Sequence, residues 1–499
     1  MRLPDVKTGR TTPPSSPART THRPATVAAL LLALFMAAME MTVVSTAMPT
    51  VVAELGGAMH YAWVFTAYML TSTVTVPIYG KLADLHGRKS VMLTAMGIFL
   101  LGSMLSGQAH TMGQLIVFRA IQGIGAGGVQ PIALTVIGDI FDIDERGKMQ
   151  GVFGAVWAIA GLAGPLLGGV IVGSLSWRWV FYVNVPFGLL SAAVISYALV
   201  EKIELRKQRL DIAGAFILTA AVVTLLLGAD GNAPWVLLPA SAVLTAAFLF
   251  VETRAKEPLL PLRLFAQRTL ATSSALSALG GGAMLGLVTF VPLYAQGVLG
   301  STPTQAGTTI ATMAVAWPVA SALSGRLIKR LGFRVLVITG FTIVGLSAIG
   351  LTIAMSQGAS ATTLRIGSAM LGVGMGIGNT PLVIAVQTSV GFSQRGVATS
   401  STMFFRNIGG TVAVGVMGVV LAGALLAGSA REAGGASLVA RILGPERRSV
   451  DPTVLASISG DLSLGIVRVM WIVTALGIAG ALVSWLFPDV ARVTPEAKS

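Results

Sequence analysis

Glu40 and Arg119 are charged residues inside apolar segments, and an ionisable side chain in a membrane span is costly enough to mark a functional site by default. Glu40 is the only carboxylate well inside such a segment, nine residues before Pro49 at one end, and Arg119 lies about six residues after Gly113 at the end of another. At about 1.5 Å per residue their depths differ by about 4 or 5 Å. We therefore expect the two side chains to meet.

The chemistry that such a pair offers is proton binding. Burial disfavours the charged form of a carboxyl group, whereas a nearby arginine favours it. A site that is alternately open to water and shielded can bind a proton in one state and release it in another. Gln122, one turn from Arg119, adds a polar group to the same helix face. The alternatives are a structural ion pair for Glu40 and, for Arg119, hydrogen bonds to loop carbonyl groups.

A second set of charges lies at the ends of apolar segments and is predicted to form an inner gate. Its members are Asp84, Arg88, Lys89, Asp139 and Arg146. A charge network between these loops would hold the inner side shut in one conformation. Asp84 could also face the N-terminus of a helix starting near Val397, whose dipole favours an anion. For Arg88 and Lys89 the alternative is the usual excess of basic residues at cytoplasmic helix ends.

One apolar segment is unusually rich in glycine. The residues that remove side chains from one face and bend the axis are Gly161, Gly164, Pro165, Gly168 and Gly169. Small residues let a neighbouring helix pack at short distance. A kinked packing helix with no further role is the alternative.

Aromatic and polar residues inside other spans are candidates for a substrate cavity, because drug-sized sites are mainly apolar with few polar anchors. They are Trp63, Tyr68, Gln122, Trp157, Phe290, Trp317 and Arg406. The aromatic residues could instead face lipid or pack between helices.

The composition excludes most soluble classes. Of 499 residues, 54% are hydrophobic and 11% charged, against roughly 25% charged in soluble domains. The net charge of +14 comes from basic residues scattered between apolar runs, so we expect no nucleic-acid partner. The chain has no cysteine and four dispersed histidines, so we expect no metal site. Because no phosphate-binding GxxxxGK[ST] sequence occurs, ATP-driven pumping has no support.

Stretches of about 20 apolar residues predict an all-α polytopic membrane protein with fourteen transmembrane helices. The predicted spans are 25–48, 62–80, 90–109, 114–137, 149–173, 179–200, 212–229, 235–251, 270–294, 305–325, 335–355, 363–386, 397–424 and 465–487.

The basic residues predict the orientation. Most Lys and Arg residues fall in alternate loops and in both ends of the chain, and the short loops of the other side hold only Arg178. By the positive-inside rule both termini are then cytoplasmic, and 425–464 is an extracellular loop. We expect cytoplasmic tails at 1–24, where the sequence predicts disorder, and at 488–499.

An internal repeat divides the chain. GKLADLHGRKSV at 80–91 matches GRLIKRLGFRVL at 325–336, and ERGKMQG at 145–151 matches QRGVATS at 394–400. Such repeats indicate two six-helix bundles with a site between them. We assign the bundles to 25–200 and 270–487, and two inserted helices with their linkers to 201–269.

Four motifs in order resemble the major facilitator superfamily and, within it, the fourteen-span drug:proton antiporter family. They are MEMTVVSTAMPTV at 39–51, GKLADLHGRK at 80–89, FRAIQGIG at 118–125 and GLAGPLLGG at 161–169. The resemblance covers about 25–490. The family more often has Asp where this chain has Glu40.

The resemblance implies proton coupling by Glu40 and Arg119 and leak prevention by the glycine-rich helix. We expect a monomeric proton-driven exporter of amphipathic compounds in a bacterial cytoplasmic membrane, with small-molecule substrates, protons and the lipid bilayer as partners. The proton gradient would be the energy source, and no cofactor is expected. A dedicated exporter of one metabolite or antibiotic and a non-transporting membrane sensor are the alternatives.

Overall fold

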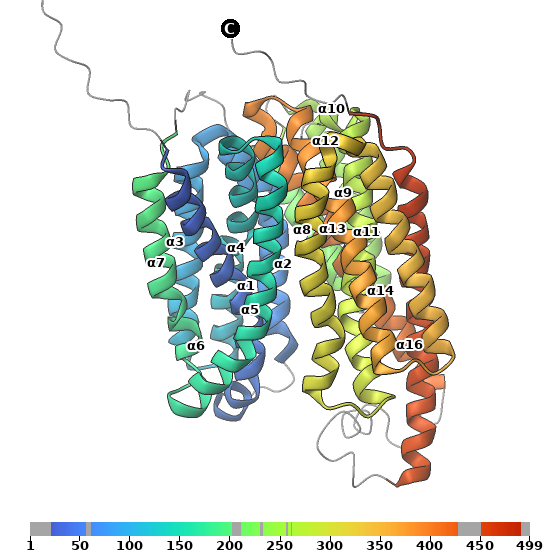
Figure 1. The fold of residues 1–499 in the computed structure, drawn as a ribbon. Coiled ribbons are helices and arrows are strands. Elements are labelled where there is room, and N and C mark those ends of the chain that lie inside the picture. The colour runs from blue at the N-terminus through green and yellow to red at the C-terminus, as the bar shows by residue number, and fades with distance from the viewer. Residues whose placement is uncertain are drawn as a thin grey trace, which may run out of the picture.

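The computed structural model describes residues 21–55, 61–201, 211–229, 233–255, 258–260, 262–427 and 451–490, and within those ranges its regular structure is entirely helical. The helices run side by side along one direction (Figure 1). In the first part of the chain they are α1 Arg23–Leu55, α2 Tyr61–His86, α3 Arg88–Gly107, α4 Met112–Ile140, α5 Ile143–Ser174, α6 Trp179–Tyr182 and α7 Asn184–Ala198. In the second part they are α8 Ile212–Ala229, α9 Pro234–Arg254, α10 Leu262–Phe265, α11 Arg268–Gly297, α12 Pro303–Ser356, α13 Ala361–Ser389, α14 Arg395–Ala427 and α16 Pro452–Ser484.

Eleven helices within the described ranges are long and apolar enough to cross a membrane, so the chain is a multi-pass membrane protein. One of them, α12, is interrupted at Gly332, where φ is 79° and ψ is 169°. A positive φ of this kind strains residues with a Cβ atom, which is why glycine occupies the break. The break lies between the predicted spans 305–325 and 335–355.

The helices form two groups, α1–α7 and α11–α16, which lie beside each other in Figure 1. Helix α5 packs against α12 and α2 against α14 across the boundary. A Cβ atom added to Gly147 would lie 2.2 Å from the Cα atom of Gly325, and one added to Gly80 would lie 1.9 Å from Ser400 Oγ. Glycine therefore permits close contacts between the two groups at these positions.

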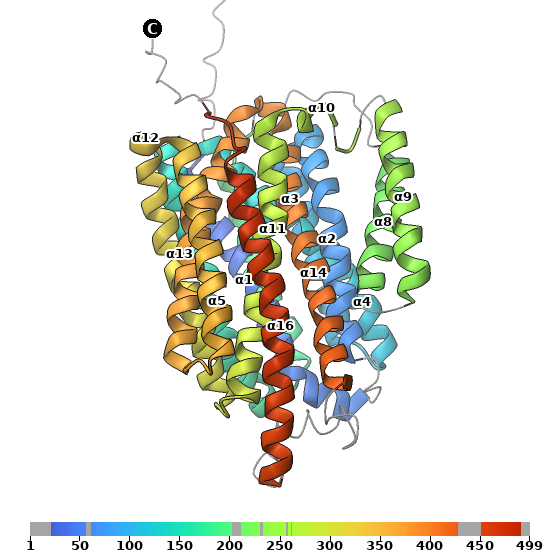
Figure 2. The ribbon, with the colours of Figure 1, turned by 90° about the vertical axis from the view of Figure 1, so that its right-hand side faces the viewer.

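The inserted helices α8 and α9 pack against each other at one edge of the molecule (Figure 2). Helix α8 also contacts both α2 and α14, so it covers one of the two seams between the groups. A Cβ atom added to Gly415 of α14 would lie 2.5 Å from the carbonyl oxygen of Ala229. The loop after α9 is held by Glu252, which accepts hydrogen bonds from the backbone N–H groups of Leu259 and Leu260 at 3.0 and 3.4 Å.

The last helix begins earlier than predicted. Helix α16 starts at Pro452 and not at 465, so the described end of the predicted loop 425–464 is helical. Asp451 caps this helix by accepting from Thr453 N at 2.9 Å, and proline suits the first helical position. Residues 428–450 lie outside the described ranges.

Both predicted tails lie mostly outside the described ranges, which begin at 21 and end at 490. Helix α1 already begins at Arg23, so the predicted tail 1–24 overlaps the helix by two residues.

Candidate functional site

Glu40 of α1 and Arg119 of α4 meet in the interior of the first group. Glu40 Oε1 accepts from Arg119 Nη1 at 2.5 Å, and neither side chain is more than 1% exposed. Arg119 Nη1 also donates to Gln122 Oε1 at 2.7 Å, and Nε donates to the carbonyl oxygen of Val64 at 3.3 Å. The structure thus places together the two residues whose depths matched in the sequence.

Tyr68, one of the candidate cavity residues, packs against this ion pair. Its ring centre lies 4.2 Å from Arg119 Cζ, and the side chain is buried. An aromatic face attracts a guanidinium group electrostatically, by about 2 kcal/mol or more when the pair is desolvated. Because breaking a buried ion pair on one side costs about 3–5 kcal/mol, the charge state of Glu40 strongly affects the energy of this region.

The sequence reasoning missed Asn184, the first residue of α7. Its Nδ2 donates to Glu40 Oε2 and, at 3.1 Å, to Ser103 Oγ of α3. Asn184 is fully buried. The sequence did contain an indication, because an amide inside the apolar span 179–200 needs a hydrogen-bonding partner. The depth of Asn184 in the span did not indicate which helix carries that partner.

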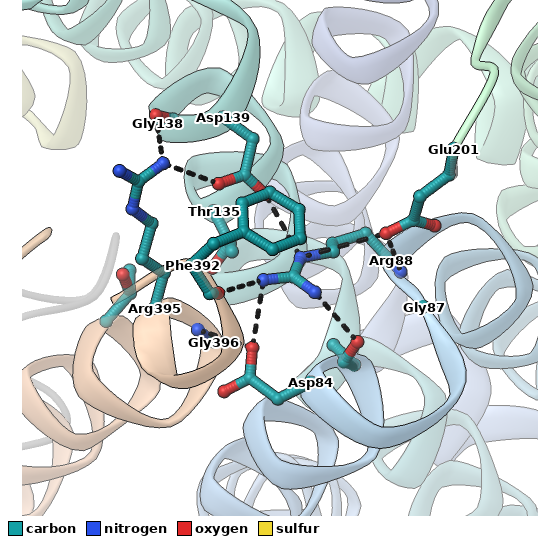
Figure 3. Close-up of polar contacts among 12 residues, drawn as sticks. Asp84, Gly87, Arg88, Thr135, Gly138, Asp139, Glu201, Phe392, Arg395 and Gly396 are labelled. Atoms are coloured by element: carbon teal, nitrogen blue, oxygen red, sulfur yellow. Dashed lines mark hydrogen bonds and ion pairs between the residues drawn. The ribbon is translucent and has the colours of Figure 1, made fainter. Parts of the chain in front are cut away.

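Asp84, in the last turn of α2, joins the two groups, and Figure 3 shows it beside Arg88 and Gly396. Its Oδ1 and Oδ2 accept from the backbone N–H groups of Gly396 and Val397 at 3.0 and 2.8 Å. These N–H groups belong to the first turn of α14, which carries the positive end of the helix dipole. We call this contact, with the ion pairs around Arg88 described next, the latch.

Arg88 is the centre of the latch. It contacts Asp84 Oδ1 through Nη2 at 3.0 Å, contacts Asp139 Oδ2 through Nε at 3.0 Å, and donates from Nη2 to the carbonyl oxygen of Phe392 at 2.6 Å. Its guanidinium carbon lies 4.2 Å from the centre of the Phe392 ring. Since Phe392 belongs to the second half of the chain, Arg88 also bridges the two groups.

Arg395 and Glu201 complete the latch and were not predicted (Figure 3). Arg395 Nη1 donates to Asp139 Oδ1 at 3.0 Å. The two carboxylate oxygens of Glu201 accept from the backbone N–H groups of Arg88 and Lys89 at 2.9 and 3.1 Å. Glu201 thereby caps α3 and orients the arginine.

Two predicted gate residues bond within the first group. Lys89 Nζ donates to the carbonyl oxygen of Ser196 at 2.5 Å, and Arg146 Nε donates to that of Phe141 at 2.9 Å. Neither of these bonds bridges the two groups. The latch end of the molecule is nevertheless closed in this conformation, because Asp84, Arg88 and Arg395 all span the boundary.

The predicted glycine-rich helix packs two of its glycines against the helix that carries Glu40. Cβ atoms added to Gly164 and Gly168 would lie 1.8 Å from Thr42 Oγ1 and 3.0 Å from Thr46 Cβ, both in α1. Cβ atoms added to Gly161 and Gly169 would have no such atom of the described chain within 4 Å. Gly164 and Gly168 therefore set the distance between α5 and α1.

This difference predicts that Gly164→Ala destabilises the protein and Gly161→Ala does not. A methyl group forced against Thr42 must move α1 or α5, and such overpacking costs about 1–3 kcal/mol. Thermal unfolding of the purified variants measures the difference, and Thr42→Ala should partly rescue Gly164→Ala. Equal melting temperatures for the two alanine variants would contradict the packing argument.

The remaining cavity candidates divide into three groups. Trp63 and Trp157 are 38% and 39% exposed, so both reach the surface of the helix groups. Phe290 is buried in the hydrophobic core of the second group and lines no open surface in this conformation, and Trp317 packs against the same core. Arg406 is partly buried beside Gly281 and forms no hydrogen bond or ion pair with the described part of the chain.

Comparisons with known proteins agree with this architecture. The sequence matches the family described as Major Facilitator Superfamily over residues 30–414. It is 38% identical over 404 residues to Multidrug transporter protein MdtP of Bacillus subtilis (strain 168), covering 79% of this chain and 74% of that protein. It is 39% identical over 403 residues to Multidrug resistance protein 3 of the same strain, covering 79% and 78%.

Solved structures show the same fold at low sequence identity. The proton:xylose symporter XylE matches with a TM-score of 0.62 and 13% identity, over 93% of this chain and 96% of that one. The human organic anion transporter MFSD10 matches with a TM-score of 0.60 and 14% identity, over 91% of this chain and 100% of that one.

Proposed function

Because the chain belongs to the major facilitator superfamily, whose members are transporters and not enzymes, we propose that it exports amphipathic drugs or toxic small molecules in exchange for protons. The observation that carries this proposal is the buried pair of Glu40 and Arg119. The names of the two Bacillus relatives, a multidrug transporter and a multidrug resistance protein, support the class of substrate.

In this proposal the proton acts by changing the partner of Arg119. With Glu40 ionised, the carboxylate balances the buried guanidinium group. Protonation removes that charge, and an uncompensated buried charge is costly. A protonated Glu40 therefore favours a conformation in which Arg119 gains water or a polar group of the substrate, which couples proton binding to movement of the helices.

In this proposal the latch controls whether the two groups are open or closed at its end of the molecule. It holds one end of the two groups together while the aromatic side chains of Trp63 and Trp157 remain exposed. Breaking it would let the groups rock apart at that end, around the contacts of α5 with α12 and α2 with α14. We propose that the latch end is cytoplasmic and that transport proceeds by alternating access.

We further propose fourteen membrane spans, as in the drug:proton antiporter branch of the superfamily, in the cytoplasmic membrane of a bacterium. Eleven helices meet the length and apolarity of a span, and α12 contains two segments on either side of Gly332. Counting α12 as two spans gives twelve. Helices α2 and α5 are not among the eleven, but each is more than 25 residues long and runs alongside the others, so they supply the remaining two of the fourteen spans.

This topology predicts that both termini are cytoplasmic and that Ser437 is extracellular. The chain contains no cysteine, so single cysteines can be introduced at Ser15 and Ser437 without a background. A membrane-impermeant thiol reagent added to intact cells should label the second variant and leave the first unlabelled until the cells are opened. Labelling in the reverse order would contradict the proposed orientation.

Export itself is tested in proteoliposomes under an imposed pH gradient. We expect accumulation of several chemically distinct amphipathic compounds against their gradients, with proton movement in the opposite direction. Accumulation of one compound alone would indicate a dedicated exporter. Accumulation that continues after the pH gradient is collapsed would contradict proton coupling.

A further inference from the structure

The amide of Asn184 contains a buried oxygen atom with no hydrogen-bond donor. Nδ2 donates to Glu40 Oε2 and to Ser103 Oγ, whereas Oδ1 has no partner among the described residues. Leaving such a buried acceptor unpaired costs about 1–3 kcal/mol. Unpaired buried polar atoms are uncommon in folded proteins, and this cluster contains two of them, Asn184 Oδ1 and Gln122 Nε2.

The two protonation states of Glu40 need opposite partners. An ionised carboxylate only accepts hydrogen bonds, whereas a protonated carboxyl group also has an O–H donor. Arg119 has donors only, and Gln122 Oε1 already accepts from Arg119. Among the side chains bonded around Glu40, Asn184 is the one whose acceptor oxygen has no hydrogen-bond partner in the described part of the chain.

Rotation of the Asn184 amide by half a turn would place Oδ1 where Nδ2 now lies. In that orientation Oδ1 accepts from a protonated Glu40. Ser103 can follow, because its hydroxyl group both donates and accepts. It now donates to the carbonyl oxygen of Phe181 at 2.8 Å and accepts from Nδ2. After the rotation it can turn to donate to Oδ1.

We propose that Asn184 is a positioning residue that presents its nitrogen to the ionised form of Glu40 and its oxygen to the protonated form. This inference rests on the proposed role of Glu40 as proton carrier. The contact between α1 and α7 then persists in both states, while the charge that holds Arg119 is present in only one. In the protonated state the Glu40 O–H group then has an acceptor and is not left unpaired, at the cost of the bond from Ser103 to Phe181 and of the present bonds of Nδ2.

Infrared difference spectroscopy of the full-length protein in lipid, between high and low pH, tests this inference. The C=O band of a protonated carboxyl group reports the hydrogen bond of its O–H group. The band of Glu40 is identified by its loss in Glu40→Gln. Asn184→Leu, which keeps the size but removes the amide, should move that band to higher wavenumber, and Asn184→Gln should leave it closer to its original position.

A matched control lies on the same helix. Ser191 Oγ donates to the carbonyl oxygen of Ala29 at 2.7 Å, so it also joins α7 to α1 from a buried position but does not contact Glu40. Ser191→Ala should leave the Glu40 band unshifted. Gradient-driven export should fall at least tenfold in Asn184→Leu and much less in Ser191→Ala.

The outcomes separate this inference from the proposed function. A Glu40 band that Asn184→Leu leaves unshifted overturns the inference and leaves Glu40 as proton carrier. Absence of any Glu40 band between the two pH values overturns both. If Asn184→Leu does not fold, Ser103→Ala replaces it and should shift the band less. Its control is Ser106→Ala, since Ser106 Oγ donates to the carbonyl oxygen of Gly102 in its own helix and has no other side-chain bond to the described residues. An unshifted band in Ser103→Ala then overturns the inference.

Discussion

Asp84→Asn should abolish transport while the affinity for substrate stays within a few fold of the unmodified protein. Asp84 accepts two backbone hydrogen bonds from the first turn of α14 and contacts Arg88. Hydrogen bonds to a charged group contribute about 1.5–3 kcal/mol each. Losing one such contribution shifts a two-state equilibrium by about tenfold or more. The variant should therefore favour the conformation that is open at the latch end.

The shift can be measured directly with spin labels at Lys148 and Arg326. These exposed residues follow Gly147 and Gly325, which touch across the boundary between the two groups. Asp84→Asn should lengthen the distance between the labels in most molecules. Asp142→Asn is the matched control, because Asp142 lies at the same end but forms no side-chain cap hydrogen bond. Loss of substrate binding in parallel with transport would instead place Asp84 in the substrate site.

The sequence predicted the contact of Asp84 with the start of α14, because Asp84 was identified by its charge and the helix start by the apolar segment 397–424. It did not predict Arg395 or Glu201. Basic residues are common at cytoplasmic helix ends for topological reasons, so charge alone did not distinguish Arg395 as a bridging residue. Glu201 accepts hydrogen bonds from the backbone N–H groups of Arg88 and Lys89. Because every helix N-terminus has such groups whatever its sequence, no residue type marks them as the partners of Glu201.

For the ion pair of Glu40 and Arg119, the sequence predicted the depth of each residue along its helix but not the rotation of the helices about their axes. Positions along the helices indicated that Glu40 and Arg119 could meet, and they do. The rotation of each helix about its axis depends on packing against several neighbours, which short sequence motifs do not specify. For that reason the sequence did not indicate that Asn184 contacts Glu40, and it left open whether Tyr68 and Phe290 line a cavity or pack between helices. The early start of α16 could have been predicted from the sequence, since Asp451 followed by Pro452 is a typical beginning of a helix.

Glu40→Gln should bind a neutral substrate and lose uphill export completely. The glutamine side chain resembles a protonated carboxyl group in shape and charge, so the variant is fixed in one state of the proton cycle. Substrate should then cause no proton movement in proteoliposomes. Glu40→Asp should retain partial activity, because it keeps the carboxyl group and moves it by one methylene.

Arg119 provides an independent check on the same site. Removing a nearby positive charge makes a carboxyl group easier to protonate. Arg119→Ala should therefore shift the pH dependence of substrate binding to higher pH, and Arg119→Lys should shift it less. Because Glu40→Gln leaves a buried guanidinium group unbalanced, its folding must first be checked by thermal unfolding. Full export by a folded Glu40→Gln protein under an imposed pH gradient would exclude Glu40 as the carrier and direct attention to Asp139, the carboxylate that Arg88 and Arg395 share in the latch.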